Sequence, residues 1–298
     1  MLPDRAARHA SPRRPFAVGR RGMVVLAIVL VACAALIVLN PPFRALIPQR
    51  GGAALVGSFF SAMFHPALSY ESQVPAGTPP LLLEALAAMR RTLVFAAAAM
   101  SLALLSGIVL GFLASSAWWS DDLAGSSSGT RWFRRVVAPA IWATTRVLIV
   151  GMRSVHELLW AVIFLAAFGL NTASAVIAIA IPYAGTLAKV FSEMIDEAPR
   201  DSAFALRAAG AGTAQVFCFG LLPRALPDMC AYAFYRFECA VRSSAVLGFF
   251  GFPTLGYSIS AAFENLHYAE VWTYLDALAL LVVAIELWSG AVRRRFVA

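Results

Sequence analysis

Residues 204–223, which read FALRAAGAGTAQVFCFGLLP, form a short segment between two long apolar runs. The alanine, leucine and arginine residues of Phe204–Ala209 favour a helix, and Gly210 is expected to end that helix in a sharp turn. A second short helix is predicted over Gln215–Leu222, and Pro223 is expected to end it. Because the flanking runs belong in lipid, the segment should lie in water at a membrane surface. Two small helices that meet at a glycine form a rigid hairpin that another protein can grip.

The composition of the chain indicates a membrane protein. Hydrophobic residues make up 60% of the 298 residues and charged residues only 13%, whereas a soluble domain is about a quarter charged. Such a chain cannot present a wettable surface, so the lipid bilayer is its expected surroundings. Its net charge of +8 comes almost entirely from arginine in short runs beside the apolar ones. That is the positive-inside pattern of membrane proteins, and no nucleic acid partner is expected.

The sequence contains no pattern typical of catalysis or of cofactor binding. It has no GxSxG, HExxH, P-loop or Gly-rich nucleotide motif, and its four histidines are scattered. The four cysteines form no CxxC pair, which predicts small apolar side chains rather than disulfides or a metal site. Without a P-loop the chain is not expected to hydrolyse ATP, so ATP-driven work would need a partner. We therefore predict no catalytic residue, no metal and no cofactor.

The N-terminal part is predicted to comprise a tail, a membrane helix and a periplasmic segment. Residues 1–22 are arginine-rich and predict a disordered cytoplasmic tail, and Met23–Leu39 is an uninterrupted apolar run. A signal peptide is the alternative, but residues 40–44 offer no small-x-small cleavage site, which favours an uncleaved first transmembrane helix. Residues 40–80 are predicted to be periplasmic, with an amphipathic helix around Leu55–Phe64 on the membrane.

Residues 81–298 are predicted to form the main transmembrane domain. Its spans are expected at Thr92–Ala117, Val136–Leu170, Thr172–Phe191, Asp228–Phe250 and Val271–Ala291. The run 136–170 is too long for one straight span, so its part up to Arg153 should lie along the interface or enter obliquely, and Leu158–Phe168 should cross. Gly251–Glu270 is predicted to be a periplasmic loop. Six spans place the basic clusters at 5–21, 131–135, 200–224 and 293–295 on the same side of the membrane. Because basic segments stay on the cytoplasmic side, both the N- and the C-terminus are predicted to be cytoplasmic.

Ionisable residues within the run Asp228–Phe250 are candidates for a functional role. A charged residue at the centre of a membrane helix costs about 2.5–3.5 kcal/mol, so Arg236, Glu238 and Arg242 must face a pore or one another. Glu238 and Arg242 are four residues apart, on one face of a helix, and able to pair. Either this pair is structural and locks the helix to a neighbour, or Arg242 or Arg236 attracts an anion that passes through the membrane.

The 204–223 hairpin resembles the cytoplasmic coupling loop of ABC importer permeases. The family pattern is Glu-Ala-Ala, three residues, Gly, nine residues, an aliphatic residue, any residue, Leu and Pro. The residues that fall in register are Ala205, Gly210, Ala211, Gln215, Leu222 and Pro223. Phe204 stands where the family has Glu, Leu206 replaces its second Ala, and Gly220 replaces its aliphatic residue. The resemblance implies a coupling loop over residues 197–223 that is held by an ATPase.

Two further stretches resemble the phosphonate branch of these permeases, the PhnE type. RSVHELLWA at 153–161 is similar to that branch's Arg-Thr/Ser-Ile-Pro-Glu-Leu-Val-Trp-Ala, and YRFECAVR at 235–242 is similar to its Tyr-Arg-Phe-Glu…Val-Arg. His156 replaces the family proline, and of the Gly-Ala-Gly-Gly-Ile-Gly run only the outer Gly251 and Gly256 remain. The resemblance makes these residues candidates for the translocation pathway: Arg153, Glu157, Arg236, Glu238 and Arg242.

The resemblance implies an all-α, polytopic membrane protein with the transmembrane domain of a type I, MetI-like ABC importer and about six transmembrane helices. Such a permease is not itself an enzyme. It works in the bacterial inner membrane with two cytoplasmic ATP-binding subunits, a second permease that is identical or a paralogue, and a periplasmic substrate-binding protein. The implied cargo is a phosphonate, phosphite or similar small oxyanion. The alternatives are an importer permease for an unrelated small solute and, in other classes, a secondary transporter, a channel or a membrane enzyme.

Overall fold

The computed structural model describes residues 20–39, 51–119 and 136–297 of the chain. The chain divides into two compact units, residues 1–57 and 58–298, and each is described by itself. The first unit contains helix α1 (Arg20–Leu39). Its side chains from Met23 to Leu39 are all exposed and all apolar, as expected of a helix whose surroundings are lipid. The basic tail predicted at residues 1–22 lies almost entirely outside the described residues.

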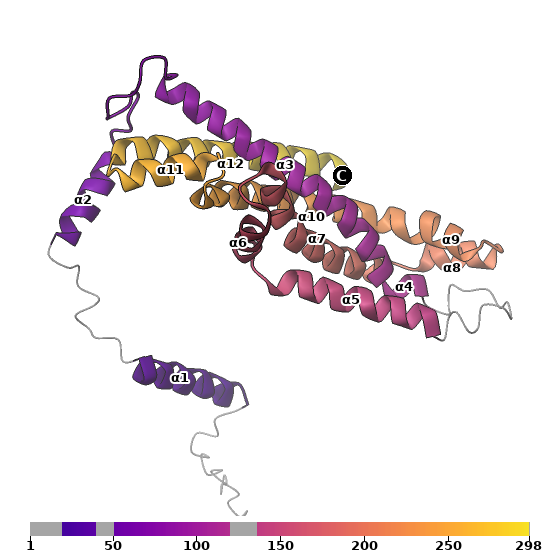
Figure 1. Ribbon diagram of the computed structural model, residues 1–298. Coiled ribbons are helices and arrows are strands. Elements are labelled where there is room, and N and C mark those ends of the chain that lie inside the picture. Colours follow the sequence, from indigo (N-terminus) through magenta and orange to yellow (C-terminus); the bar gives the residue numbers. More distant parts are fainter. Residues whose placement is uncertain (1–19, 40–50, 120–135, 298) are drawn as a thin grey trace, which may run out of the picture. The chain divides into compact units, whose positions relative to one another are not determined.

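The second unit is a bundle whose long helices are α3 (Leu81–Ala114), α7 (Thr172–Glu197), α10 (Leu222–Val246) and α12 (Tyr268–Val297) (Figure 1). Helix α3 packs most extensively against α7. Two glycines of α3 permit this approach: a Cβ atom on Gly107 would lie 2.8 Å from Leu187 Cβ, and one on Gly111 would lie 3.0 Å from Phe191 Cβ. At these two points the bare backbone of α3 packs against the larger side chains Leu187 and Phe191 of α7.

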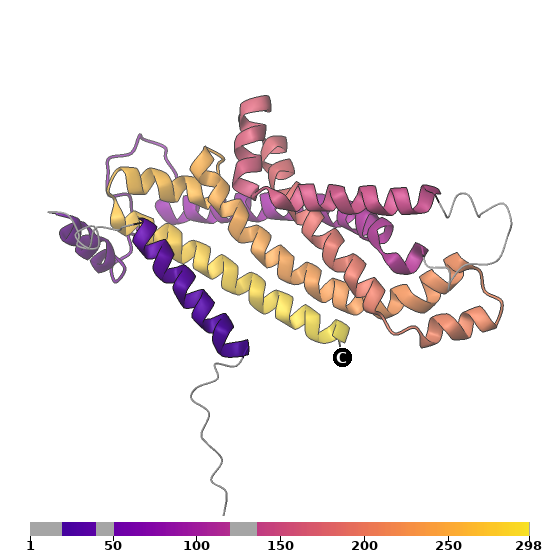
Figure 2. The same ribbon diagram turned by 90° about the horizontal axis from the view of Figure 1, so that it is seen from below.

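The segment predicted to be too long for one span is broken into two helices. Helices α5 (Ala138–Ser154) and α6 (Glu157–Phe168) meet at an angle of 89°, and α6 stands steeply off the bundle (Figure 2). His156 is the N-cap of α6, and its Nδ1 atom accepts a hydrogen bond from the Leu158 N–H at 3.3 Å. The break predicted between Arg153 and Leu158 is confirmed, and His156 begins the second helix where the related permeases have proline.

Among the described residues, four helices are long and apolar enough to cross a membrane: α1, α3, α7 and α12. Two broken pairs, α5 with α6 and the path 213–250 with α11 (Leu255–Glu264), pass the same test as pairs. Counting each pair as one span gives the six that the sequence predicts. Helix α3 begins eleven residues before Thr92 because helix-favouring residues continue back to Pro80, its N-cap.

The prediction that Gly251–Glu270 is a loop is wrong. The 3₁₀ turn Leu247–Phe250 ends at Gly251, whose φ is +93°, and the chain then re-enters a helix as α11. A Cβ atom on Gly256 would overlap the Ala245 carbonyl oxygen, so only glycine lets α11 pack this closely against the end of α10. The absence of lysine and arginine from this stretch does not distinguish a loop from a short helix, and packing against α10 and α12 stabilises the helix.

The segment before α3 is held to the start of α12. Helix α2 (Gly52–Ala62) begins three residues before the predicted Leu55–Phe64 helix, and residues 40–50 lie outside the described residues. The Trp272 indole N–H donates to the Phe59 carbonyl at 2.7 Å, and Thr273 Oγ1 donates to the Ala67 carbonyl at 2.6 Å. This end of the bundle lies opposite the end that carries α8 (Asp201–Ala208) and α9 (Thr213–Val216) (Figure 1).

Candidate functional site

The 204–223 hairpin consists of α8, a glycine turn and α9. Gly210 has a φ of +86°, a conformation that glycine adopts without steric cost. The Gly210 N–H donates to the Arg207 carbonyl at 3.0 Å and the Ala211 N–H to the Leu206 carbonyl at 3.0 Å, which closes the end of α8. The predicted helix and sharp turn are confirmed.

The prediction that Pro223 ends the second helix is wrong. Helix α9 runs on through a π-helical segment, η5 (Phe217–Leu221), directly into α10. Pro223 lies in the first turn of α10, a position in which proline is common. At the other end of α9, Gln215 Oε1 accepts a hydrogen bond from the Gly212 N–H at 2.9 Å. Gln215 therefore caps the start of the second arm.

The two arms of the hairpin are packed tightly against each other. A Cβ atom on Gly220 would lie 3.1 Å from Ala203 Cα, and the Ser202 hydroxyl donates to the Gly220 carbonyl at 2.9 Å. Gly220, in place of the family's aliphatic residue, therefore lets η5 approach α8. Val216 and Phe217, on the second arm of the hairpin, are buried. The hairpin is a rigid unit fused to α10.

The outer face of the hairpin is apolar and exposed. Phe204, in the position of the family's Glu, is 51% exposed, and Phe219 on the second arm is 74% exposed. Ala205 and Gln215 are also exposed, whereas Ala211 and Leu222 are half-buried. Large, exposed apolar side chains on the two arms of a rigid hairpin indicate a surface that binds a protein partner.

A second group of polar side chains joins α6, α7 and α10. The Tyr183 hydroxyl is 2.9 Å from Ser243 Oγ, and Ser243 Oγ donates to Glu157 Oε1 at 2.9 Å. The Arg236 guanidinium lies over the Tyr183 ring, 4.3 Å from its centre. Two predicted pathway residues, Glu157 and Arg236, are thus brought together by Tyr183 and Ser243, which the sequence did not single out. We call these four residues the Tyr183 cluster.

The remaining predicted pathway residues are Arg153, Glu238 and Arg242. Arg242 Nη2 is 3.3 Å from Glu238 Oε1 and 3.6 Å from Cys239 Sγ, so the predicted pair forms. It joins two turns of α10, and it locks this helix to no other among the described residues. The Arg242 side chain is 54% exposed and that of Glu238 only 13%. Arg153, also exposed, lies in the last turn of α5 and places its stem against Gly185 of α7.

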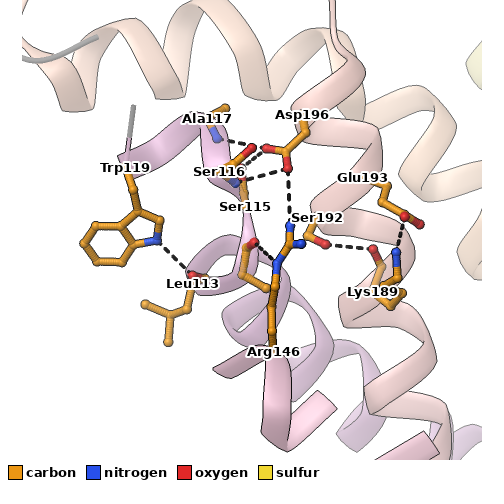
Figure 3. Close-up of polar contacts among 11 residues, drawn as sticks. Leu113, Ser115, Ser116, Ala117, Trp119, Arg146, Lys189, Ser192, Glu193 and Asp196 are labelled. Atoms are coloured by element: carbon orange, nitrogen blue, oxygen red, sulfur yellow. Dashed lines mark hydrogen bonds and ion pairs between the residues drawn. The ribbon is translucent and has the colours of Figure 1, made fainter. Parts of the chain in front are cut away.

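A third site, which the sequence did not reveal, centres on Asp196 near the end of α7 (Figure 3). Asp196 Oδ1 accepts hydrogen bonds from Ser115 Oγ at 2.7 Å and the Ala117 N–H at 2.9 Å, and Oδ2 accepts from the Ser116 N–H at 3.1 Å. Asp196 thereby caps the short helix α4 (Ser116–Trp119), whose first N–H groups have no partner within that helix. Arg146 of α5 lies 3.7 Å from Asp196 Oδ2.

Comparison with known proteins agrees with this architecture. Residues 107–297 match the family described as binding-protein-dependent transport system inner membrane component. The phosphite transport system permease protein PtxC of Stutzerimonas stutzeri is 34% identical over 192 residues, which cover 59% of this chain and 69% of the relative. The phosphate-import permease protein PhnE of Mycolicibacterium smegmatis is 30% identical over 156 residues, 52% of this chain and 29% of that longer relative. A crystal form of the MetNI methionine ABC transporter, in inward-facing conformations, superposes with a TM-score of 0.57 at 22% identity, covering 72% of this chain and 96% of that chain.

Proposed function

The chain belongs to the family of inner membrane components of binding-protein-dependent transport systems, and we propose that it is the ABC importer permease subunit that carries phosphite, a phosphonate or a similar small oxyanion inward. Its fold is that of a type I, MetI-like transmembrane domain, as the sequence predicts. The chain would provide the path of the solute through the membrane. ATP-binding subunits would power the transport, and a binding protein would deliver the cargo.

The observation that carries the coupling role is the geometry of the 204–223 hairpin. It is rigid, it projects at one end of the bundle (Figure 1), and it exposes Phe204 and Phe219. Because η5 and α10 are continuous, any movement of the hairpin moves the helix that carries Arg236. Two ATP-binding subunits would each hold one hairpin, and ATP hydrolysis would take place in those subunits, since this chain has no P-loop.

The cargo assignment is supported by the Tyr183 cluster together with the similarity to PtxC. Within the described residues Arg236 forms no ion pair, and its Nε atom is buried without a hydrogen-bond partner. A cation on a ring face keeps its positive charge and can attract an anion. Arg153 and Arg242 are exposed on the same subunit, which adds positive charge along α5 and α10. Arginine is suited to binding phosphorus oxyanions because its donors match their oxygen geometry.

The assembly that we propose contains a second permease, identical or paralogous, so that two sets of pathway residues face each other. A periplasmic substrate-binding protein would deliver cargo at the end of the bundle that carries α11. Both termini and the hairpin would then be cytoplasmic, in keeping with the one-sided arginine clusters. This orientation also leaves the 251–270 region, which has no lysine or arginine, on the periplasmic side.

The proposed contact of Phe204 and Phe219 with the ATP-binding subunit is tested by substituting Phe219, the more exposed of the two. In Phe219→Asp the ATP-binding subunit should no longer copurify with the permease, because a carboxylate would be buried in an apolar contact. Leu266→Asp is the matched control, since Leu266 is exposed at the opposite end of the bundle and has a φ of +61°, which aspartate tolerates. Copurification that is unchanged in Phe219→Asp, or lost equally in both variants, would contradict the proposed surface.

A further inference from the structure

The corner between α3 and α4 is held by side chains from two other helices. Ser115, which separates α3 from α4, and Ala117 are fully buried. Their partner Asp196 belongs to α7, and its carboxylate is only 19% exposed. A helix as short as α4 has no stability of its own, so its position depends on the carboxylate that caps it. Movement of the end of α7 must therefore carry α4 with it.

The same corner contacts the second arm of the hairpin through aromatic rings. The Trp118 ring centre is 5.3 Å from that of Phe217, and Phe112 is 5.0 Å from Phe217, both at steep angles. Phe217 is the first residue of η5. The first arm, α8, begins at Asp201, just after the end of α7. The second arm of the 204–223 hairpin thus packs against the corner that Asp196 holds, and the first arm follows directly in the chain from the end of α7.

Arg146 connects this corner to α5. Its Nη2 atom is 3.7 Å from Asp196 Oδ2 (Figure 3). Its Nε atom donates to the Ala114 carbonyl at 3.2 Å, and its guanidinium lies 4.3 Å from the Trp142 ring centre. Arg153 lies on the same helix, about 10 Å farther along at about 1.5 Å per residue. The next helix begins at Glu157, in the Tyr183 cluster. Helix α5 therefore leads from the hairpin end to the proposed pathway.

From this arrangement we propose that Asp196 and Arg146 are positioning residues that couple movement of the hairpin to α5 and so to the pathway. The inference rests on the proposed function, since it assigns these residues to the coupling between the ATPase and transport. When the hairpin moves, α7, α4 and η5 move as one packed body. The Asp196–Arg146 pair is a polar connection from that body to α5. When the pair opens, the Arg146 side chain, 41% exposed, stays accessible to solvent, and the Asp196 carboxylate keeps its hydrogen bonds from residues 115–117.

The test measures cargo imported per ATP hydrolysed, in proteoliposomes that contain the complete complex. Arg146→Gln removes the charge but leaves Asp196 to cap α4, so the fold should be retained. We expect normal yield and sustained ATP hydrolysis, with a fall in cargo per ATP of about fivefold or more, a typical allosteric coupling factor. Arg146→Lys should recover part of the ratio because it restores the charge. Asp196→Asn combined with Arg146→Gln should be no worse than Asp196→Asn alone if the two residues act as a pair.

The matched control is the Lys189–Glu193 pair, which lies on α7 close to Asp196 and joins residues of one helix only. Lys189→Gln should leave the ratio of cargo to ATP unchanged. The inference is overturned if Arg146→Gln keeps the wild-type ratio, or if its ATP hydrolysis and import fall in the same proportion, which would indicate a purely structural role. A wild-type complex that imports no oxyanion at all would instead contradict the proposed function.

Discussion

Arg236 of α10 lies with its guanidinium 4.3 Å from the centre of the Tyr183 ring on α7. The contact stabilises a cation between two long helices by cation–π attraction, and it leaves the charge unneutralised. The Tyr183 hydroxyl is hydrogen-bonded to Ser243, and Ser243 in turn donates to Glu157. Tyr183 thus contacts a positive charge with its ring and is linked through its hydroxyl and Ser243 to a negative charge. Such an arrangement can present both a cation and hydrogen-bonding groups to an oxyanion.

Removing only the Tyr183 hydroxyl should weaken transport without unfolding the protein. Tyr183→Phe keeps the ring beneath Arg236 but releases Ser243 from its hydroxyl partner, a loss of about 1 kcal/mol or about fivefold in rate. Initial uptake rates should be compared at equal amounts of folded permease. Tyr235→Phe is the control, because Tyr235 is exposed on α10. Uptake by Tyr183→Phe at the same rate as by Tyr235→Phe would show that the Tyr183 hydroxyl plays no part in transport.

A β-branched residue at Gly210 should uncouple the ATPase from transport. Valine is strained at the observed φ of +86°, at a cost of about 1–3 kcal/mol, so the hairpin turn should be distorted while membrane insertion stays intact. Uptake and substrate-stimulated ATP hydrolysis should both fall. Gly212→Ser is the control, because Gly212 has an ordinary φ of −70° and is an N-cap, where serine is favoured. Full activity in Gly210→Val would show that the turn plays no part in coupling.

Arg242 should matter more for transport than for folding. Since its side chain is 54% exposed and it pairs within one helix, the pair should contribute less than about 1 kcal/mol to stability. Arg242→Ala should therefore give nearly normal folded yield and reduced uptake, and Glu238→Ala combined with it should not restore uptake. If instead either single variant lowers the folded yield and the double variant recovers it, the pair is structural and locks α10 in the assembled complex.

The orientation of the chain should follow its arginine clusters. Reporter fusions at Ser127, which lies outside the described residues, and at Asn265, between α11 and α12, should report the cytoplasm and the periplasm respectively. The physical basis is the cost of translocating basic segments. Reporters on the same side of the membrane would overturn the six-span topology.

Local sequence predicts those features that depend on local physics. The turn at Gly210, the break before Glu157 and the pairing of Glu238 with Arg242 each follow from backbone preference or helical spacing, and each is confirmed. The apolar runs predict the all-helical membrane fold, although α3 extends beyond its run. Pro223 gives an ambiguous local signal, because a proline suits the first turn of a helix as well as the position after one.

Features that depend on contacts distant in sequence left no local signal. Asp196 is 81 residues from Ser115, and neither residue belongs to a motif. Helix α11 is stabilised by packing on α10 and α12, and not by an apolar run. Tyr183 and Ser243 are ordinary helix residues until the bundle places them 2.9 Å apart. These are the residues on which the proposed pathway and its coupling depend.

The most direct test of the account is uptake of radiolabelled phosphite by proteoliposomes that contain this permease, its ATP-binding subunits and its substrate-binding protein. We expect accumulation that requires both ATP and the binding protein, that unlabelled phosphonate reduces by competition, and that Arg236→Gln abolishes at normal folded yield. Accumulation that persists without ATP would indicate a secondary transporter or channel. ATP-driven import of an uncharged solute, with no oxyanion import under the same conditions, would contradict the proposed cargo.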